Sequence, residues 1–168
     1  MTYLEIDSAL VEITRKMYAE CQVRLDAVPI ENATERKAIQ LESGMYTFCG
    51  NAGELFNTGW ERKKVFSVRK NYVNRVLYKY PSLNNIYQAL NSEEKMCFIA
   101  ALHAEIAIRE QWLDKKEAEL AAATASGDTK SIFELTIQLG AVKNMFAAWE
   151  QWRVENNVFP HMFEGDFA

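Results

Sequence analysis

The sequence predicts an all-α protein, a compact bundle of five or six helices. Hydrophobic residues make up 49% of the 168 positions and charged residues 25%, a balance typical of a folded domain with a core. Only seven glycines and three prolines occur, which disfavours a turn-rich β-sandwich or β-barrel. Apolar residues recur at helical spacings of three and four. We expect a single helical domain over residues 1–158 and an aromatic, acidic tail over 159–168.

Two helices are expected in the first third of the chain. The first should begin near Asp7 or Ser8 and end before Pro29, because proline has no N–H and disfavours a helical residue before it. The second should begin at Asn32, which stands three residues before Glu35 at the spacing of a capping box.

Four of the seven glycines fall between Gly44 and Gly59, inside or just after the second helical stretch. Gly44, Gly50 and Gly53 would each cost a helix about 1 kcal/mol relative to alanine. Close packing against another helix is our preferred explanation for them. A break in the helix and a ligand-binding loop over 44–59 are the alternatives.

The rest of the chain predicts a third helix and a long C-terminal hairpin. The third helix should begin at Thr58 and end at Tyr80, before Pro81, with a short helix or turn over 82–90.

The arms of the hairpin are expected at about 92–125 and 129–156, with Gly127 in the turn. The second arm carries the clearest heptad, at Ile132, Leu135, Leu139, Val142, Phe146 and Trp149. Its broad apolar surface should pack on the first three helices, with a homodimer through the hairpin as the alternative.

Charge is distributed unevenly. Residues 59–80 contain seven basic residues and one acidic residue, whereas the whole chain has a net charge of −4. On a helical wheel, valines gather on one side of this segment, and polar and basic residues gather on the other. Such a surface could meet an acidic protein surface or a phosphate backbone, or could neutralise neighbouring acidic helices. The candidate partner- or nucleic-acid-binding residues are Lys63, Lys64, Ser67, Lys70, Asn71, Asn74, Arg75 and Tyr78.

No catalytic, metal-binding or cofactor-binding motif is visible. Cys21, Cys49 and Cys97 are far apart and form no C-x-x-C pair, and the two histidines, His103 and His161, lack a metal-ligand spacing. Phosphate-binding loops, dinucleotide-binding glycines and nucleophile elbows are also absent from the sequence. We therefore predict no catalytic residues, no metal and no cofactor.

These observations favour a non-catalytic helical protein that binds another macromolecule and modulates it, by occlusion, inhibition or bridging. A protein partner with an acidic surface is expected first. The alternatives are a nucleic-acid-binding accessory protein that uses residues 60–80, and a small-ligand binder or enzyme with a site between helices. Motif-poor helical proteins of this size are often regulators or inhibitors from mobile elements such as phages. A cytoplasmic protein without a membrane span is expected, because no run of eighteen apolar residues and no signal sequence are present.

Overall fold

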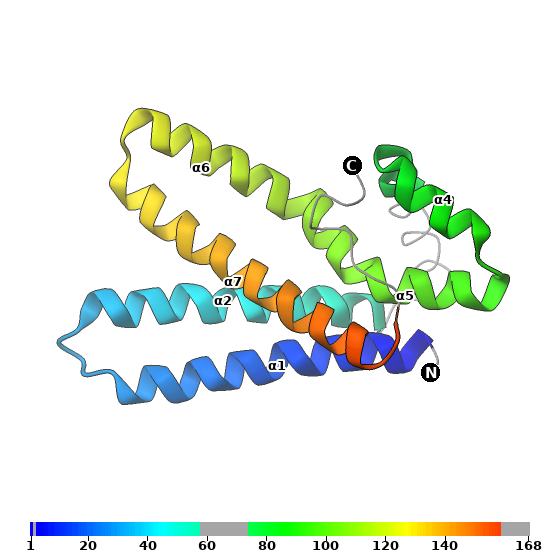
Figure 1. The fold of residues 1–168 in the computed structure, drawn as a ribbon. Helices are drawn as coiled ribbons and strands as arrows, with labels where there is room; N and C mark the ends of the chain where they lie inside the picture. The colour runs from blue at the N-terminus through cyan, green and yellow to red at the C-terminus, as the bar shows by residue number, and fades with distance from the viewer. Residues whose placement is uncertain (2, 58–73, 159–168) are drawn as a thin grey trace.

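The computed structural model describes residues 1, 3–57 and 74–158, and every regular element in these ranges is a helix (Figure 1). Residues 74–79 are helical. The other elements are α1 (Tyr3–Ala27), α2 (Ala33–Asn57), α4 (Pro81–Ala89), α5 (Ser92–Ile108), the π-helical turn η1 (Arg109–Leu113), α6 (Asp114–Ser126) and α7 (Thr129–Glu155). Because α5, η1 and α6 follow one another without a break, they form one long rod. The predicted all-α helical bundle is confirmed.

Helix α1 begins at Tyr3, several residues before the predicted start at Asp7 or Ser8. The physical reason is packing: Ile6 and Leu10 are both buried in the main core, so the first turns are stabilised by tertiary contacts that no capping signal announces. Helix α1 ends at Ala27, as Pro29 predicts.

The turn between α1 and α2 is closed by side chains from the start of α2. The backbone N–H of Glu35 donates to Asn32 Oδ1 at 3.4 Å, and the Asn32 amide donates to the Glu35 carboxylate at 2.6 Å. Arg36 donates to the carbonyl oxygens of Leu25 and Val28, at 2.9 and 2.7 Å. The two hydrogen bonds from Arg36 satisfy carbonyl groups at the end of α1 and just after it, where no further helical turn follows.

The glycines of α2 lie within a continuous helix, and the close packing predicted for them is tested at Gly44 alone. The helix continues to Asn57 through Gly44, Gly50 and Gly53, so the predicted alternative of a break is wrong over these positions. A Cβ atom added at Gly44 would meet nothing within 4 Å, so close helix packing is wrong at that residue. Gly59 lies outside the described residues.

The C-terminal hairpin forms as predicted, with arms at 92–126 and 129–155. Gly127 adopts the left-handed conformation at φ 71°, which ends α6. Asp128 caps α7, because its carboxylate accepts from the Ser131 backbone N–H at 3.1 Å and from the Ser131 hydroxyl at 2.6 Å. At the start of the first arm, Asn91 and Glu94 exchange side-chain-to-backbone hydrogen bonds of 2.8 and 2.9 Å.

The π-helical turn η1 in the middle of the rod was not predicted. The N–H of Asp114 bonds to the carbonyl of Arg109, five residues earlier. In a regular helix, residues five apart point about 140° away from each other. The π turn brings them onto one side, and Ile108 and Leu113 are consequently 1% and 2% exposed. The rod therefore changes its packing partners here without a break: α5 contacts α1 and α2, whereas α6 contacts α7.

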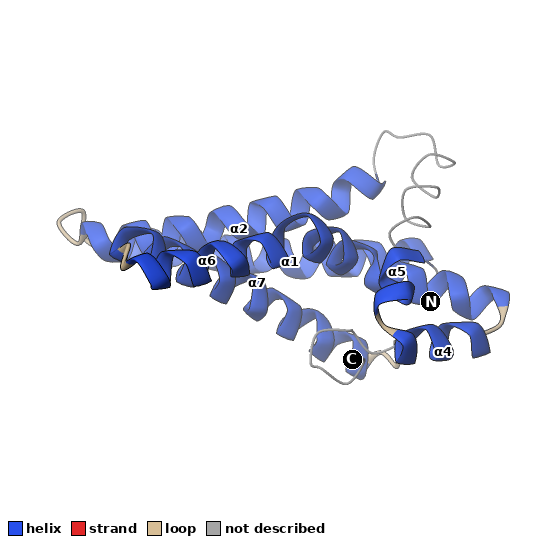
Figure 2. Ribbon diagram, turned by 90° about the horizontal axis from the view of Figure 1, so that it is seen from above, coloured by secondary structure: helices blue, strands red, loops and turns tan. Residues whose placement is uncertain are grey.

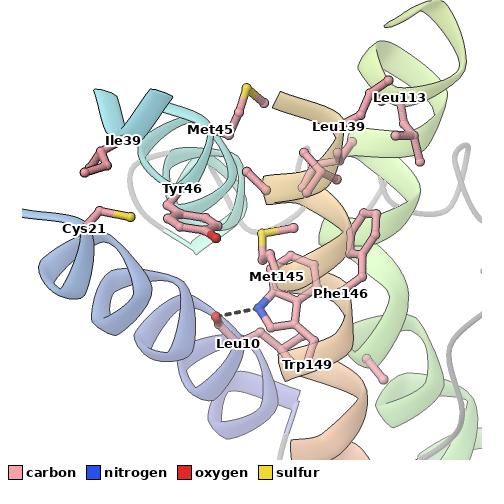
Figure 3. Close-up of a cluster of buried hydrophobic side chains, with 14 of the residues drawn as sticks. Leu10, Cys21, Ile39, Met45, Tyr46, Leu113, Leu139, Met145, Phe146 and Trp149 are labelled. Atoms are coloured by element: carbon pink, nitrogen blue, oxygen red, sulfur yellow. Dashed lines mark hydrogen bonds between the residues drawn. The ribbon is translucent and has the colours of Figure 1, made fainter. Parts of the chain in front are cut away.

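Two hydrophobic cores lie along the molecule. The main core joins α1, α2 and α7 to the rod (Figure 3). In this core the Trp149 indole N–H donates to the Leu10 carbonyl at 3.0 Å and to the Thr14 hydroxyl at 3.1 Å. The second core joins residues 74–79 and α4 to α5 through Val76, Leu77, Leu83, Phe98, Ile99 and Leu102. Figure 2 shows α4 beside α5, at the opposite end from the α1–α2 and α6–α7 turns.

Arg153 links the end of α7 to α5. Its side chain is fully buried, donates to the Ala101 carbonyl at 3.2 Å and pairs with Glu150 at 3.2 Å. A buried charge is stable only with such partners. In the described ranges no helix combines the length and apolar character that a membrane crossing needs.

Candidate functional site

The structure describes one end of the predicted basic segment. Asn74, Arg75 and Tyr78 lie in the helical stretch 74–79, and all three are exposed. The other predicted contact residues lie outside the described residues and stay predictions: Lys63, Lys64, Ser67, Lys70 and Asn71.

The helical stretch 74–79 is anchored by its apolar side. Val76 and Leu77 are buried in the second core, whereas Tyr78 is 92% exposed. The helix ends at Lys79, because Tyr80 is the N-cap residue of α4 and Pro81 begins that helix. The polar side of this stretch therefore faces outward, as the helical wheel predicts.

Lys79 connects this stretch to the rod. Its ammonium group lies 3.1 Å from a carboxylate oxygen of Asp114, and the Arg109 guanidinium lies 3.7 Å from the other oxygen. Arg109 also bonds to the Tyr80 hydroxyl at 3.3 Å. Asp114 thus brings two cations together, one from the basic segment and one from η1. Lys79 and Asp114 are 51% and 41% exposed, so water screens this pair and it adds less than about 1 kcal/mol to stability.

The sequence did not single out Lys79, Arg109 or Asp114. Lys79 could have been found, because it follows Arg75 by four residues and therefore lies on the same side of a helix. Arg109 and Asp114 could not, because Asp114 meets Lys79 across 35 residues of sequence and Arg109 joins them only through Asp114.

The two described cysteines differ in burial. Cys21 is buried, and burial is the main cause that raises the pKa of its thiol to about 11, with the neighbouring Glu42 carboxylate as a second cause. Cys97 is partly buried on α5, and its thiol lies 3.7 Å from the Met1 carbonyl. No group of three potential metal ligands occurs among the described residues. The Cys49 and His103 side chains, and His161, are outside what the structure describes.

A shallow pocket of about 390 Å³ lies between the first turns of α2 and α7. It is lined by Ala33, Thr34, Lys37, Thr129, Lys130 and Phe133. Of the residues that line the pocket, Lys37 forms an ion pair with Glu134, and next to the lining Asp128 is bound to Ser131. It holds no arrangement that suggests catalysis.

No protein-family model, no curated protein and no solved structure matches this chain. The arguments about function therefore depend on the residues and their geometry.

Proposed function

We propose that the protein is a non-catalytic helical interaction protein that binds a negatively charged macromolecule and modulates it. The basic segment over 59–80 is the binding element, and the observation that carries the proposal is the outward orientation of its described end. Asn74, Arg75 and Tyr78 are exposed, while Val76 and Leu77 fix the helix on the second core. A cytoplasmic location belongs to the same proposal.

Two further observations support this function. Tyr78 is 92% exposed, and a tyrosine ring of that size left in water is typical of interaction surfaces, where it contributes strongly to affinity. Seven of the eight charged residues over 59–80 are basic, although the chain is acidic as a whole. Such a local charge attracts a partner of opposite sign at short range, because salt screens the distant acidic residues beyond about 8 Å.

The test is affinity purification from the native host, compared between the wild type and two variants by quantitative mass spectrometry. The site variant replaces four basic residues of the segment by glutamate: Lys63, Lys64, Lys70 and Arg75. The control variant makes the same total change of charge at four other lysines: Lys16, Lys115, Lys130 and Lys143.

We expect the wild type and the control variant to retain the same partner and the site variant to lose it, with all three folded by circular dichroism. A folded site variant that retains the partner as well as the wild type does would overturn the proposal. Equal loss in both variants would also overturn it, since binding would then follow total charge alone.

A further inference from the structure

The exposed side of residues 74–79 has Tyr78 near its centre. At 100° per residue, Asn74, Tyr78, Arg75 and Lys79 follow one another over about 140° of the helix surface, directly opposite the buried pair Val76 and Leu77. The ring is therefore displayed on the solvent side of a helix that the second core holds in place.

Cations lie on one flank of this ring and continue onto the rod. Arg75 and Lys79 are three residues before and one residue after Tyr78, and Arg109 lies 3.7 Å from Asp114, the carboxylate that pairs with Lys79. We call Asn74, Arg75, Tyr78, Lys79 and Arg109 the cationic face. The formal charges of these five residues and Asp114 sum to +2.

We infer that the cationic face binds single-stranded nucleic acid, with a base stacked on Tyr78 and backbone phosphates on Arg75, Lys79 and Arg109. The inference depends on the proposed function and specifies its partner. Aromatic rings flanked by cations are the common means of binding single strands, because every base offers a face for stacking and every nucleotide a phosphate. The Asn74 amide can bond to a base edge.

A single strand fits this surface better than a duplex or an acidic protein does. In a duplex the base faces are stacked inside and cannot reach a ring on a convex helix. An acidic protein can satisfy the cations and can also cover Tyr78 with an apolar side chain, whereas a single strand supplies both a phosphate and a flat face on every nucleotide. Asp114 competes with the incoming phosphates for Lys79 and Arg109. Its pair with Lys79 is exposed and is therefore exchanged at little cost.

The test measures binding of fluorescently labelled oligouridine and oligothymidine, each of about twelve nucleotides, to the full chain by fluorescence anisotropy. The Tyr78→Ala variant should bind roughly 5- to 150-fold more weakly, which corresponds to the loss of one stacked base. The Tyr78→Phe variant keeps a flat ring and should bind within about threefold of the wild type. The matched control is Tyr18→Ala, which removes a tyrosine that is 39% exposed on α1, and it should bind as the wild type does.

The charges are tested through salt dependence. Because each phosphate contact releases counterions, Lys79→Gln should lower the slope of log K against log salt by about 0.7. Asp114→Asn removes the competing carboxylate and should raise the affinity by a few-fold, which a merely structural role of the pair would not do.

Three results would overturn the inference. One is the absence of oligonucleotide binding by the wild type at low salt, and another is a Tyr78→Ala variant that binds as the wild type does. The third is competition by polyglutamate as effective as that by unlabelled oligonucleotide, which would indicate an acidic protein instead. If the host partner is still lost in the four-residue site variant, the proposed function survives any of these results. If that partner is retained, the proposed function itself fails.

Discussion

The hydrogen bonds of Trp149 make a quantitative prediction about how α7 is fixed to α1. The indole N–H donates to two buried oxygens of α1, the Leu10 carbonyl and the Thr14 hydroxyl, and Trp149 itself is 1% exposed. The Thr14 hydroxyl in turn donates to the Leu10 carbonyl at 3.1 Å. Replacement of Trp149 by phenylalanine keeps an aromatic ring but removes the donor.

The expected loss can be estimated from these contacts. Removing one partner of a buried hydrogen bond costs roughly 1–3 kcal/mol, and the smaller ring adds about 1 kcal/mol for the space it leaves. We therefore expect Trp149→Phe to lower the free energy of unfolding by about 2–4 kcal/mol, and Tm by roughly 5–15 °C for a chain of this size. Thr14→Val should cost at most about 1.5 kcal/mol, because the indole keeps the Leu10 carbonyl as its acceptor.

Urea unfolding followed by circular dichroism measures these values. The matched control is Trp152→Phe, the same substitution one turn later at a partly buried tryptophan, and it should cost less than about 1 kcal/mol. The reasoning is refuted if Trp149→Phe costs no more than this control. Additive effects of Trp149→Phe and Thr14→Val would show that the two side chains do not act together.

The remaining predictions concern two glycines and two thiols. Gly44→Ala should raise the free energy of unfolding by up to about 1 kcal/mol, because the site is helical with open space around it. Gly127→Ala should lower it by about 1–2 kcal/mol, because the backbone there is left-handed, so two identical substitutions should shift the urea midpoint in opposite directions. At pH 8 a thiol reagent should modify Cys97 in the folded protein, whereas Cys21, with a pKa of about 11, should react only after unfolding. Peptide mapping distinguishes the two, and rapid labelling of Cys21 in the folded chain would contradict its burial.

The sequence predicts those parts of the fold that local chemistry determines. Pro29, the Asn32–Glu35 capping pair and the turn at Gly127 act within a few residues of themselves. For this reason the ends of the helices around them are readable without any knowledge of the rest of the chain.

The features that the sequence could not predict depend on contacts between distant segments. The early start of α1 depends on burial of Ile6 against other helices, and the π turn depends on a core that takes both Ile108 and Leu113. Arg153 reads as an ordinary exposed arginine near a helix end, because its partner on α5 is fifty-two residues away.

The candidate site likewise contains residues that the sequence predicts and residues that depend on contacts between distant segments. The exposure of Asn74 and Tyr78 follows from the helical wheel, since periodicity is a local property of the segment. The inclusion of Arg109 in the site does not follow from the helical wheel. It depends on the ion pair between Lys79 and Asp114, two residues that are 35 positions apart in the sequence. The contribution of Lys63, Lys64, Ser67, Lys70 and Asn71 stays a prediction.

The weak energetics of the Lys79–Asp114–Arg109 contact bear on its role. An exposed arrangement of this kind adds little to stability, and its loss would leave the second core, which holds residues 74–79 through Val76 and Leu77, unchanged. The anchoring and the charge of this surface are therefore carried by different residues. Substitutions at Lys79 or Asp114 can consequently change the electrostatic field around Tyr78 without moving the helix that carries it. This separation makes the charge of the cationic face testable by single substitutions at Lys79 and Asp114, with circular dichroism to check that each variant is folded.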